Sequence, residues 1–379
     1  MKSNTASRTK AKSHELTISK VEAIPISIPL KQPIKWARGH ISSVDNVIVV
    51  VTLTDGSQGI ADAPPRTTIY GDTQQSLLAI ILHHLGPELI GVNAFDIARV
   101  HWVFNAVAGN IAAKAALDMA IYDAQAKSLG IPCAQLLGGT VKSLPVNWRF
   151  SLGGKKQLLA EAENMMKRYG FKAFKVKCGF DPARDIDLLR ALRKQVGDDV
   201  EIAVDMNQGY SAQQLIEAAP AFEDINIALI EEPLPARDKD GKLLAAQSMT
   251  VPISGDDSCF TLDDVRDQLE IGAIRSIVIK CARTGYTISR DIVGLARAFY
   301  RPVHNGSQAD MQIGSAAAAH FACTYEAIHA HEFSSFLDAT DHVANQDLLI
   351  KDGKLILPEG PGIGLTLDPA KIRKYRVDK

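Results

Sequence analysis

Two apolar stretches near the start of the chain predict strands over residues 18–28 and 44–53. The second stretch ends at Thr54-Asp55-Gly56-Ser57, a turn signal that indicates a hairpin. Helical periodicity follows over residues 72–85, 96–106 and 111–129, where apolar residues recur at intervals of three and four. We therefore expect an α+β domain over residues 16–140, with its strands first and its helices afterwards.

After residue 139 the pattern changes to a short apolar strand that ends in a polar residue, then a loop and an amphipathic helix, repeated along the chain. Successive strand ends are 24 to 28 residues apart, about the length of one βα unit, and eight such units close a parallel barrel. The predicted strand ends are Ser151, Lys177, Asp205, Glu231, Asp256, Lys280, Asn305 and Glu332. Residues 141–356 are therefore predicted to form a TIM-type barrel, and residues 357–379 a C-terminal segment that packs back on the first domain.

Composition and charge limit the partners of the protein. The 379 residues include 42 Lys and Arg against 43 Asp and Glu, a net charge of -1, so no overall field attracts nucleic acid or an anionic membrane. The five cysteines form no Cys-x-x-Cys pair, which suits reduced thiols better than a disulfide framework or a structural zinc site. No apolar run is long enough for a transmembrane helix, and residues 1–15, which lack the apolar core of a secretory signal, are predicted to be a disordered tail. We expect a cytoplasmic protein with a small-molecule partner.

Carboxylates end three successive predicted strands, at Asp205, Glu231 and Asp256. Because the carboxyl ends of barrel strands meet at one mouth, these acids would repel one another unless a divalent cation lay among them. An all-oxygen set suits Mg²⁺, or Mn²⁺, better than zinc. We therefore predict a Mg²⁺ site held by these three residues, with Asn207 near enough to contact the metal through water or to contact the substrate.

Three lysines surround the same predicted mouth. Lys175 and Lys177 alternate along strand two and both point inward, and Lys280 ends strand six, well round the ring. Repulsion between neighbouring ammonium groups, with partial burial, favours the neutral form of one of them and would give an amine base at neutral pH. An isolated Lys-x-Lys pair is usually a solvated strand edge, but the three nearby acids favour a catalytic interpretation.

Taken together, these motifs resemble the enolase superfamily, specifically the muconate lactonizing enzyme (muconate cycloisomerase) subgroup. The resemblance covers the chain from about residue 16. Two departures are Asp257, where the subgroup usually has Glu, and Gly285-Tyr286, where a double glycine is common. The matching residues are Lys175, Lys177, Asp205, Asn207, Glu231-Glu232-Pro233, Asp256, Ser258 and Lys280, with Ala116-Leu117-Asp118, Asp123 and Leu136-Leu137-Gly138-Gly139 before the barrel.

The resemblance implies a modified (β/α)7β or (β/α)8 TIM barrel under the N-terminal capping domain, and a homo-oligomer. It implies a Mg-dependent enzyme that abstracts the α-proton of a small carboxylate substrate through a metal-stabilised enolate. Lys177 and Lys280 would be base and acid on opposite faces, in either order, and Lys175 would give electrostatic support. One enolate can lead to cycloisomerisation, to racemisation or epimerisation of an amino-acid derivative, or to β-elimination. A catalytically silent barrel that acts as a binding protein is disfavoured, because burying so many charges without use is costly.

The distal pocket must select among these reactions. The resemblance places its lid in two loops of the N-terminal domain, with Arg38, Arg66 and Tyr70 as candidate substrate-binding residues. Strand eight ends at Glu332 and lacks the Asp-x-Asp pair with which dipeptide epimerases of this subgroup hold the substrate ammonium. Glu332 either contacts the substrate or pairs with Lys280 or the backbone. We therefore favour a muconate-type cycloisomerase over a racemase or epimerase.

Overall fold

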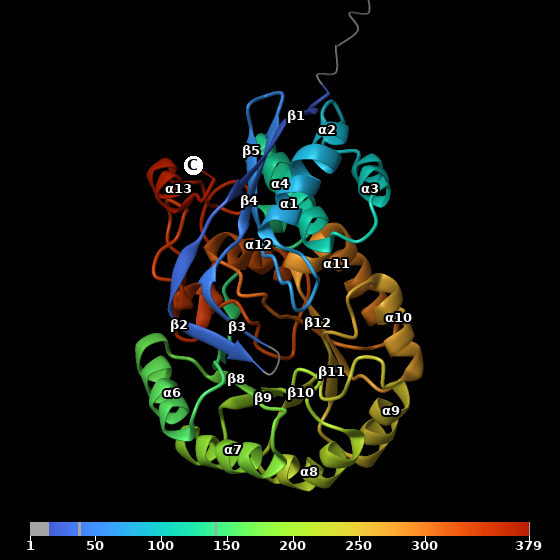
Figure 1. Ribbon diagram of the computed structural model, residues 1–379, viewed down its shortest axis with the longest axis vertical. Coiled ribbons are helices and arrows are strands. Elements are labelled where there is room, and N and C mark those ends of the chain that lie inside the picture. Colours follow the sequence, from blue (N-terminus) through green and yellow to red (C-terminus); the bar gives the residue numbers. More distant parts are fainter. Residues whose placement is uncertain (1–14, 37–38, 141, 379) are drawn as a thin grey trace, which may run out of the picture.

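The computed structural model describes residues 15–36, 39–140 and 142–378. Arg38 and residues 1–14 of the predicted tail lie outside these ranges. Figure 1 shows a layer of strands and helices at the N-terminal end of the molecule, lying over a ring of helices that surrounds a curled sheet. The arrangement confirms the predicted fold class, a TIM-type barrel beneath an N-terminal α+β cap.

The cap contains an antiparallel sheet in the order β1-β4-β5 and a separate hairpin of β2 and β3. The turn expected at residues 54–57 is confirmed, because β4 pairs with β5 across it. The sequence pattern did not predict the two strands of this hairpin, because Pro29 and Pro33 interrupt the apolar run of β2. The pairing of β2 with β3 shifts register between Pro29 and Ile34. The strand bounds are β1 (Ile18–Pro25), β2 (Ile28–Trp36), β3 (Gly39–Val44), β4 (Val47–Leu53) and β5 (Gln58–Ala63).

Helices of the cap follow its strands along the chain, as predicted. The central helix α4 is buried along most of its length because it lies between β5 and α11. At Gly59 of β5 a Cβ atom would lie 1.9 Å from the carbonyl oxygen of Ala120, so only glycine permits this approach. The bounds are α1 (Gln74–Ile80), the π-helical turn η1 (Ile81–Leu85), α2 (Gly86–Leu89), α3 (Ile97–Asn105), α4 (Ile111–Leu129) and α5 (Cys133–Leu136).

In the described part of the chain, seven parallel strands form the barrel sheet, in the order β13-β12-β11-β10-β9-β8-β7. Helices alternate with these strands and form the outer ring in Figure 1. The strands are β7 (Trp148–Arg149), β8 (Ala173–Lys177), β9 (Glu201–Asp205), β10 (Leu229–Glu231), β11 (Ile253–Gly255), β12 (Ser276–Ile279) and β13 (Val303–Asn305). The helices are α6 (Lys155–Tyr169), α7 (Pro182–Val196), α8 (Ala212–Asp224), α9 (Lys239–Ser248), α10 (Leu262–Ile271), α11 (Cys281–Ala298) and α12 (Gln312–Ala322).

The predicted eighth strand is reduced to a single parallel bridge between Val146 and His331. The ring still closes there, because the N–H of Asn147 donates to His331 O at 2.9 Å and the N–H of Glu332 donates to Asn305 O at 2.9 Å. Glu332 therefore lies between the first and seventh strands, at the mouth of the barrel.

The C-terminal segment contacts the cap. The N–H of Ile363 donates to Asp123 Oδ1 at 2.7 Å, and the N–H of Ser27 donates to Tyr375 O at 3.0 Å. The remaining elements are β6 (Leu144–Pro145), η2 (Ser335–Asp338), β14 (Leu349–Lys351), β15 (Lys354–Ile356) and α13 (Pro369–Tyr375). The exact domain boundaries stay a prediction. Among the described helices, none combines the length and the apolar character needed to span a bilayer.

Asp118 joins the cap to the barrel. Its carboxylate accepts from the N–H groups of Tyr286 at 2.6 Å and Thr287 at 3.1 Å, which restart α11 after a break at Gly285. Gly285 has φ +62°, and a Cβ there would lie 2.6 Å from Asp118 Oδ2. The neighbouring Tyr286 ring is fully buried and stacks on Phe321. The departure from a double glycine therefore fills the interior and presents no ring to the mouth.

Candidate active site

Three carboxylates gather at the carboxyl end of the barrel sheet. Asp205 ends β9 and pairs in register with Glu231, which ends β10, and Asp256 directly follows β11. Each of the three is at most 2% exposed. Asp205 and Asp256 line a cavity of about 250 Å³, and Glu231 lies beside it in contact with Lys175. The structure thus places the predicted acids at the ends of three neighbouring strands.

Two lysines of β8 neutralise part of this negative charge. Lys175 Nζ lies 2.6 Å from Glu231 and 3.8 Å from Asp205. Lys177 Nζ lies 2.5 Å from Asp205. Because both lysines line the cavity, the predicted inward orientation of the Lys-x-Lys pair is confirmed.

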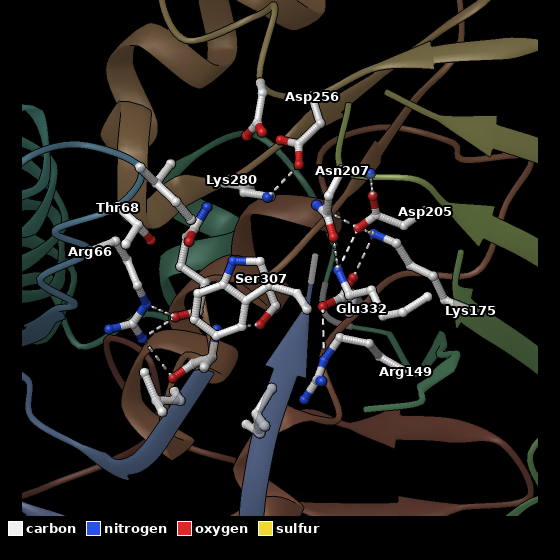
Figure 2. Close-up of a pocket in the computed structure, with 18 of the residues that line it drawn as sticks. Arg66, Thr68, Arg149, Lys175, Asp205, Asn207, Asp256, Lys280, Ser307 and Glu332 are labelled. Carbon is white, nitrogen blue, oxygen red and sulfur yellow. Dashed lines mark hydrogen bonds and ion pairs between the residues drawn. The ribbon is translucent and has the colours of Figure 1, made fainter. Parts of the chain in front are cut away.

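A third lysine reaches the cavity from the end of β12. Lys280 Nζ lies 2.6 Å from Asp256, whose other oxygen lies 3.0 Å from Arg283 Nη1. Figure 2 shows Lys280 and Asp256 on one side of the site and Lys175 with Asp205 on the other. Lysines from β8 and β12 therefore approach one cavity from separate directions.

The protonation expected for these lysines has to be corrected. Burial alone lowers the pKa of Lys175, but four buried carboxylates, Glu231 foremost, raise that pKa well above its ordinary value. Burial likewise lowers the pKa of Lys280, but Asp256, together with Glu231 and Tyr70, raises it overall. Of the Lys175–Lys177 pair expected to contain one neutral amine, Lys175 is therefore not that amine, because the acids outweigh the ammonium repulsion.

The donor chemistry of the three acids fits a divalent cation. In the described ranges, no three His, Cys, Asp or Glu side chains are already arranged to hold a metal ion. Lysines pair with all three acids. Burial raises the pKa of Glu231 well above its usual range, and Asp205 and Asp256 raise it further, so Lys175 compensates only part of the charge. A buried all-oxygen set of this kind suits Mg²⁺.

Glu332 is held by two cations at the mouth. Its carboxylate lies 2.8 Å from Lys175 Nζ and 3.4 Å from Nε of Arg149. Pairing of Glu332 with Lys280, one of the alternatives expected from the sequence, is not found between these two residues. Burial raises the pKa of Glu332, but Lys175 and Arg149 lower it overall.

Arg149 was not predicted from the sequence. It ends β7, two residues before the predicted end at Ser151, and pairs in register with Lys175. Its guanidinium also donates to Asp338 at 2.6 Å. The available signal was a charged residue between two aromatic residues, in the sequence Trp148-Arg149-Phe150.

Polar residues after β9 and β11 complete the wall. Asn207, with φ +44°, donates its N–H to Asp205 Oδ1 at 2.9 Å and accepts from Lys177 at 3.1 Å, so it lies beside the acids as predicted. Asp257 lines the cavity and accepts from the Gln208 side chain at 2.7 Å. The shorter acid at position 257 thus binds a neutral amide.

Apolar side chains cover the part of the cavity that faces the cap. They come from the hairpin of β2 and β3, from the loop before α1 and from the loop after β11. Their side chains restrict the access of water, which strengthens electrostatic interactions inside the site. These residues are Ile34, Trp36, Ile41, Ile69 and Phe260.

The three predicted lid residues differ in how they relate to the cavity. Arg66 lines the cavity, and its Nε donates to the backbone oxygen of Gln308 at 2.8 Å, which fastens its loop to the segment after β13. Tyr70 packs edge-on against Phe260, with ring centroids 5.6 Å apart, and is not among the residues that line the cavity. Substrate binding by Arg66 and Tyr70 stays a prediction, and Arg38 lies outside the described residues.

Comparison with known proteins places these features in a family. Residues 18–138 match the mandelate racemase/muconate lactonizing enzyme N-terminal domain, and residues 157–371 match the enolase C-terminal domain-like family. The L-Ala-D/L-Glu epimerase of Bacillus subtilis is 32% identical over 92% of this chain and 97% of its own. Muconate cycloisomerase 1 of Pseudomonas putida is 31% identical over 94% and 98%. The crystal structure of a muconate lactonizing enzyme from Mycobacterium smegmatis, complexed with muconolactone, is 36% identical, with a TM-score of 0.93 over 96% of this chain and all of that one.

Proposed function

This chain belongs to the mandelate racemase/muconate lactonizing enzyme family of the enolase superfamily, and on that premise we propose that it is a muconate-type cycloisomerase. The ion pairs of Glu332 are the observation that favours cycloisomerisation over epimerisation. Lys175 and Arg149 already neutralise this carboxylate, so it is poorly placed to bind the ammonium group of an amino-acid derivative. A substrate without an ammonium group is therefore favoured.

The charge at the cavity supports a dicarboxylate. Among the described residues, six basic and six acidic side chains line the cavity or form an ion pair with those that do. With a divalent cation bound, the site has an excess of two positive charges, which a dicarboxylate dianion neutralises and a zwitterion does not. The basic residues are Arg66, Arg149, Lys175, Lys177, Lys280 and Arg283, and the acidic ones are Asp205, Glu231, Asp256, Asp257, Glu332 and Asp338.

Asp205, Glu231 and Asp256 would hold Mg²⁺, or Mn²⁺. Bound there, the cation would supply Lewis-acid stabilisation of the negative charge that develops on a substrate carboxylate. Lys175, fixed between Glu231 and Glu332, adds a positive charge at the same end of the cavity.

Lys177 and Lys280 carry the proton transfer in this proposal. When one carboxylate of the substrate adds to the diene, the carbon beside the other carboxylate needs a proton. An ammonium on either side of the cavity can deliver it, and the face of addition decides which lysine acts. The apolar wall that includes Trp36 and Ile41 holds the unsaturated chain and restricts water.

The test is incubation of the protein with cis,cis-muconate and Mg²⁺ in D₂O. Loss of the diene absorbance, with a lactone carrying one deuterium beside its free carboxylate in the NMR spectrum, is the expected result. An unchanged diene signal together with α-proton exchange in Ala-Glu dipeptides would instead establish an epimerase and refute the proposal.

The second candidate is an epimerase or racemase of an amino-acid derivative, and one observation favours it. Asp257 lines the cavity, and the hydrogen bond found for its carboxylate in the described structure comes from the neutral amide of Gln208. This acid could hold a substrate ammonium in place of Glu332. If the dipeptide exchange is seen, Asp257→Asn should abolish it and leave Mg²⁺ binding in place.

A further inference from the structure

A buried ion pair outside the cavity holds the turn that carries Asp256. We propose that Glu232, with Lys242 as its counter-ion, is a positioning residue for the divalent-cation site and acts by fixing the turn of residues 256–258. The inference rests on the proposed function, because it treats Asp256 as a ligand of the cation.

Glu232 follows Glu231 along the chain but faces the other way. Glu231 binds Lys175 at the mouth, whereas Glu232, just beyond the end of β10, binds Lys242 of the outer helix α9. Glu232 Oε1 accepts from Lys242 Nζ, on α9, at 2.6 Å, and both side chains are 1% exposed. The two charges neutralise each other, so Glu232 adds no net charge to the cavity.

The second carboxylate oxygen of Glu232 binds the turn after β11. Oε2 accepts from the N–H of Asp256 at 2.8 Å, from the N–H of Ser258 at 2.9 Å and from Ser258 Oγ at 2.8 Å. One oxygen thus holds three donors, all from residues 256–258, in the manner of an anion in a nest of N–H groups. Loss of the carboxylate would leave two buried backbone N–H groups without this partner.

The backbone of Glu232 extends the connection to the loop after β9. Its N–H donates to Ser254 O at 2.9 Å, and its carbonyl accepts from the N–H of Gln208 at 2.7 Å. Its φ of +35° is rare for a residue with a side chain, and such conformations persist where the surroundings fix them. Glu232 therefore links the two loops that carry Asn207 and Asp256 on either side of β10.

A fixed turn matters because the Asp256 carboxylate must exchange partners. It binds Lys280 at 2.6 Å and Arg283 at 3.0 Å, and it has to release Lys280 before it can bind a metal ion. If the backbone moved with the departing lysine, Asp256 would leave Asp205 and Glu231. The bonds to Glu232 oppose that movement.

A titration with Mn²⁺, monitored through the EPR signal of the free ion, tests this role without requiring turnover. Glu232→Gln keeps the size of the side chain but removes its charge and presents an NH₂ group to donors. We expect it to weaken Mn²⁺ binding by about 10-fold or more, the usual effect of changing a residue that orients a metal ligand. Ser258→Ala removes only the hydroxyl donor and should weaken Mn²⁺ binding by about 2- to 10-fold.

Lys127→Met is the matched control. It breaks the pair formed by buried Asp123 and partly exposed Lys127, 2.7 Å apart in the cap, and should lower the melting temperature with no change in the Mn²⁺ Kd. An unchanged Mn²⁺ Kd in Glu232→Gln, or an equal weakening of Mn²⁺ binding in Lys127→Met, would overturn this inference but leave the proposed function standing. If Glu232→Gln does not fold, Ser258→Ala decides, and an unchanged Kd there overturns it. A wild-type protein that binds no Mn²⁺ would overturn the proposed function and this inference with it.

Discussion

Replacement of Arg149 by methionine tests the charge network beside the cavity. Arg149 is 7% exposed, with Nη2 2.6 Å from Asp338 and Nε 3.4 Å from Glu332. Methionine supplies a flexible apolar side chain that can fill much of the space without the charge. The variant therefore leaves Glu332 with Lys175 as its cation and removes the arginine partner of Asp338.

The size of the effect follows from what each acid retains. Removing one partner of a buried ion pair costs about 3–5 kcal/mol when the remaining charge is left uncompensated. Here Glu332 keeps Lys175 at 2.8 Å, and Asp338 is 20% exposed, so water shares part of its charge. We expect the free energy of unfolding to fall by about 2–3 kcal/mol, the size of a hydrogen bond to a charged group.

Urea unfolding at neutral pH measures this difference as a lower midpoint at an unchanged m-value. The double variant Arg149→Met/Asp338→Asn is the matched control, and it should recover part of the loss because the second charge is also removed. Equal midpoints for the wild type and Arg149→Met would refute the claim that Arg149 neutralises the two acids.

Three further outcomes are expected. Gly285→Ala should lower the free energy of unfolding by more than about 1 kcal/mol in urea, because φ is +62° and the new Cβ would meet Asp118, whereas Gly294→Ala, with open space, should not. Burial and the nearby Asp62 raise the pKa of Asp310 to about 7, so the wild type loses stability as the pH rises from the ordinary carboxyl range to about 7. Over that pH range the free energy of unfolding of Asp310→Asn should fall by less than that of the wild type, by about 4 kcal/mol at most. Identical profiles of unfolding free energy against pH for the two proteins would contradict this. After treatment with EDTA, added Mg²⁺ should raise the melting temperature, and no shift would count against the metal site.

The ends of the barrel strands could be predicted from the sequence. Strands β8, β9, β10 and β13 end at Lys177, Asp205, Glu231 and Asn305, as the pattern predicts. In each case an apolar strand meets a polar residue at the mouth, so the change in polarity itself marks the end. Glu332 was placed at the mouth correctly, although its strand is only a bridge.

The partners of the charged side chains could not be predicted in the same way. Arg149 lies in a two-residue strand, too short for an alternating pattern, so its contact with Glu332 was missed. The protonation of Lys175 depends on carboxylates from other strands, whereas the sequence argument considered only its neighbour. Arg66 looked free to bind an anion, but its donors reach backbone oxygens of a loop about 240 residues away in sequence, which no local pattern reveals.

The central claim is that carboxylates from three strands hold one divalent cation between them. An anomalous difference map from crystals of the protein soaked in Mn²⁺ tests this most directly. The account predicts one strong peak bounded by oxygens of Asp205, Glu231 and Asp256, with Lys177 and Lys280 turned from these acids toward the cavity. A map with no peak among the three carboxylates, or with Mn²⁺ held only elsewhere, would contradict it.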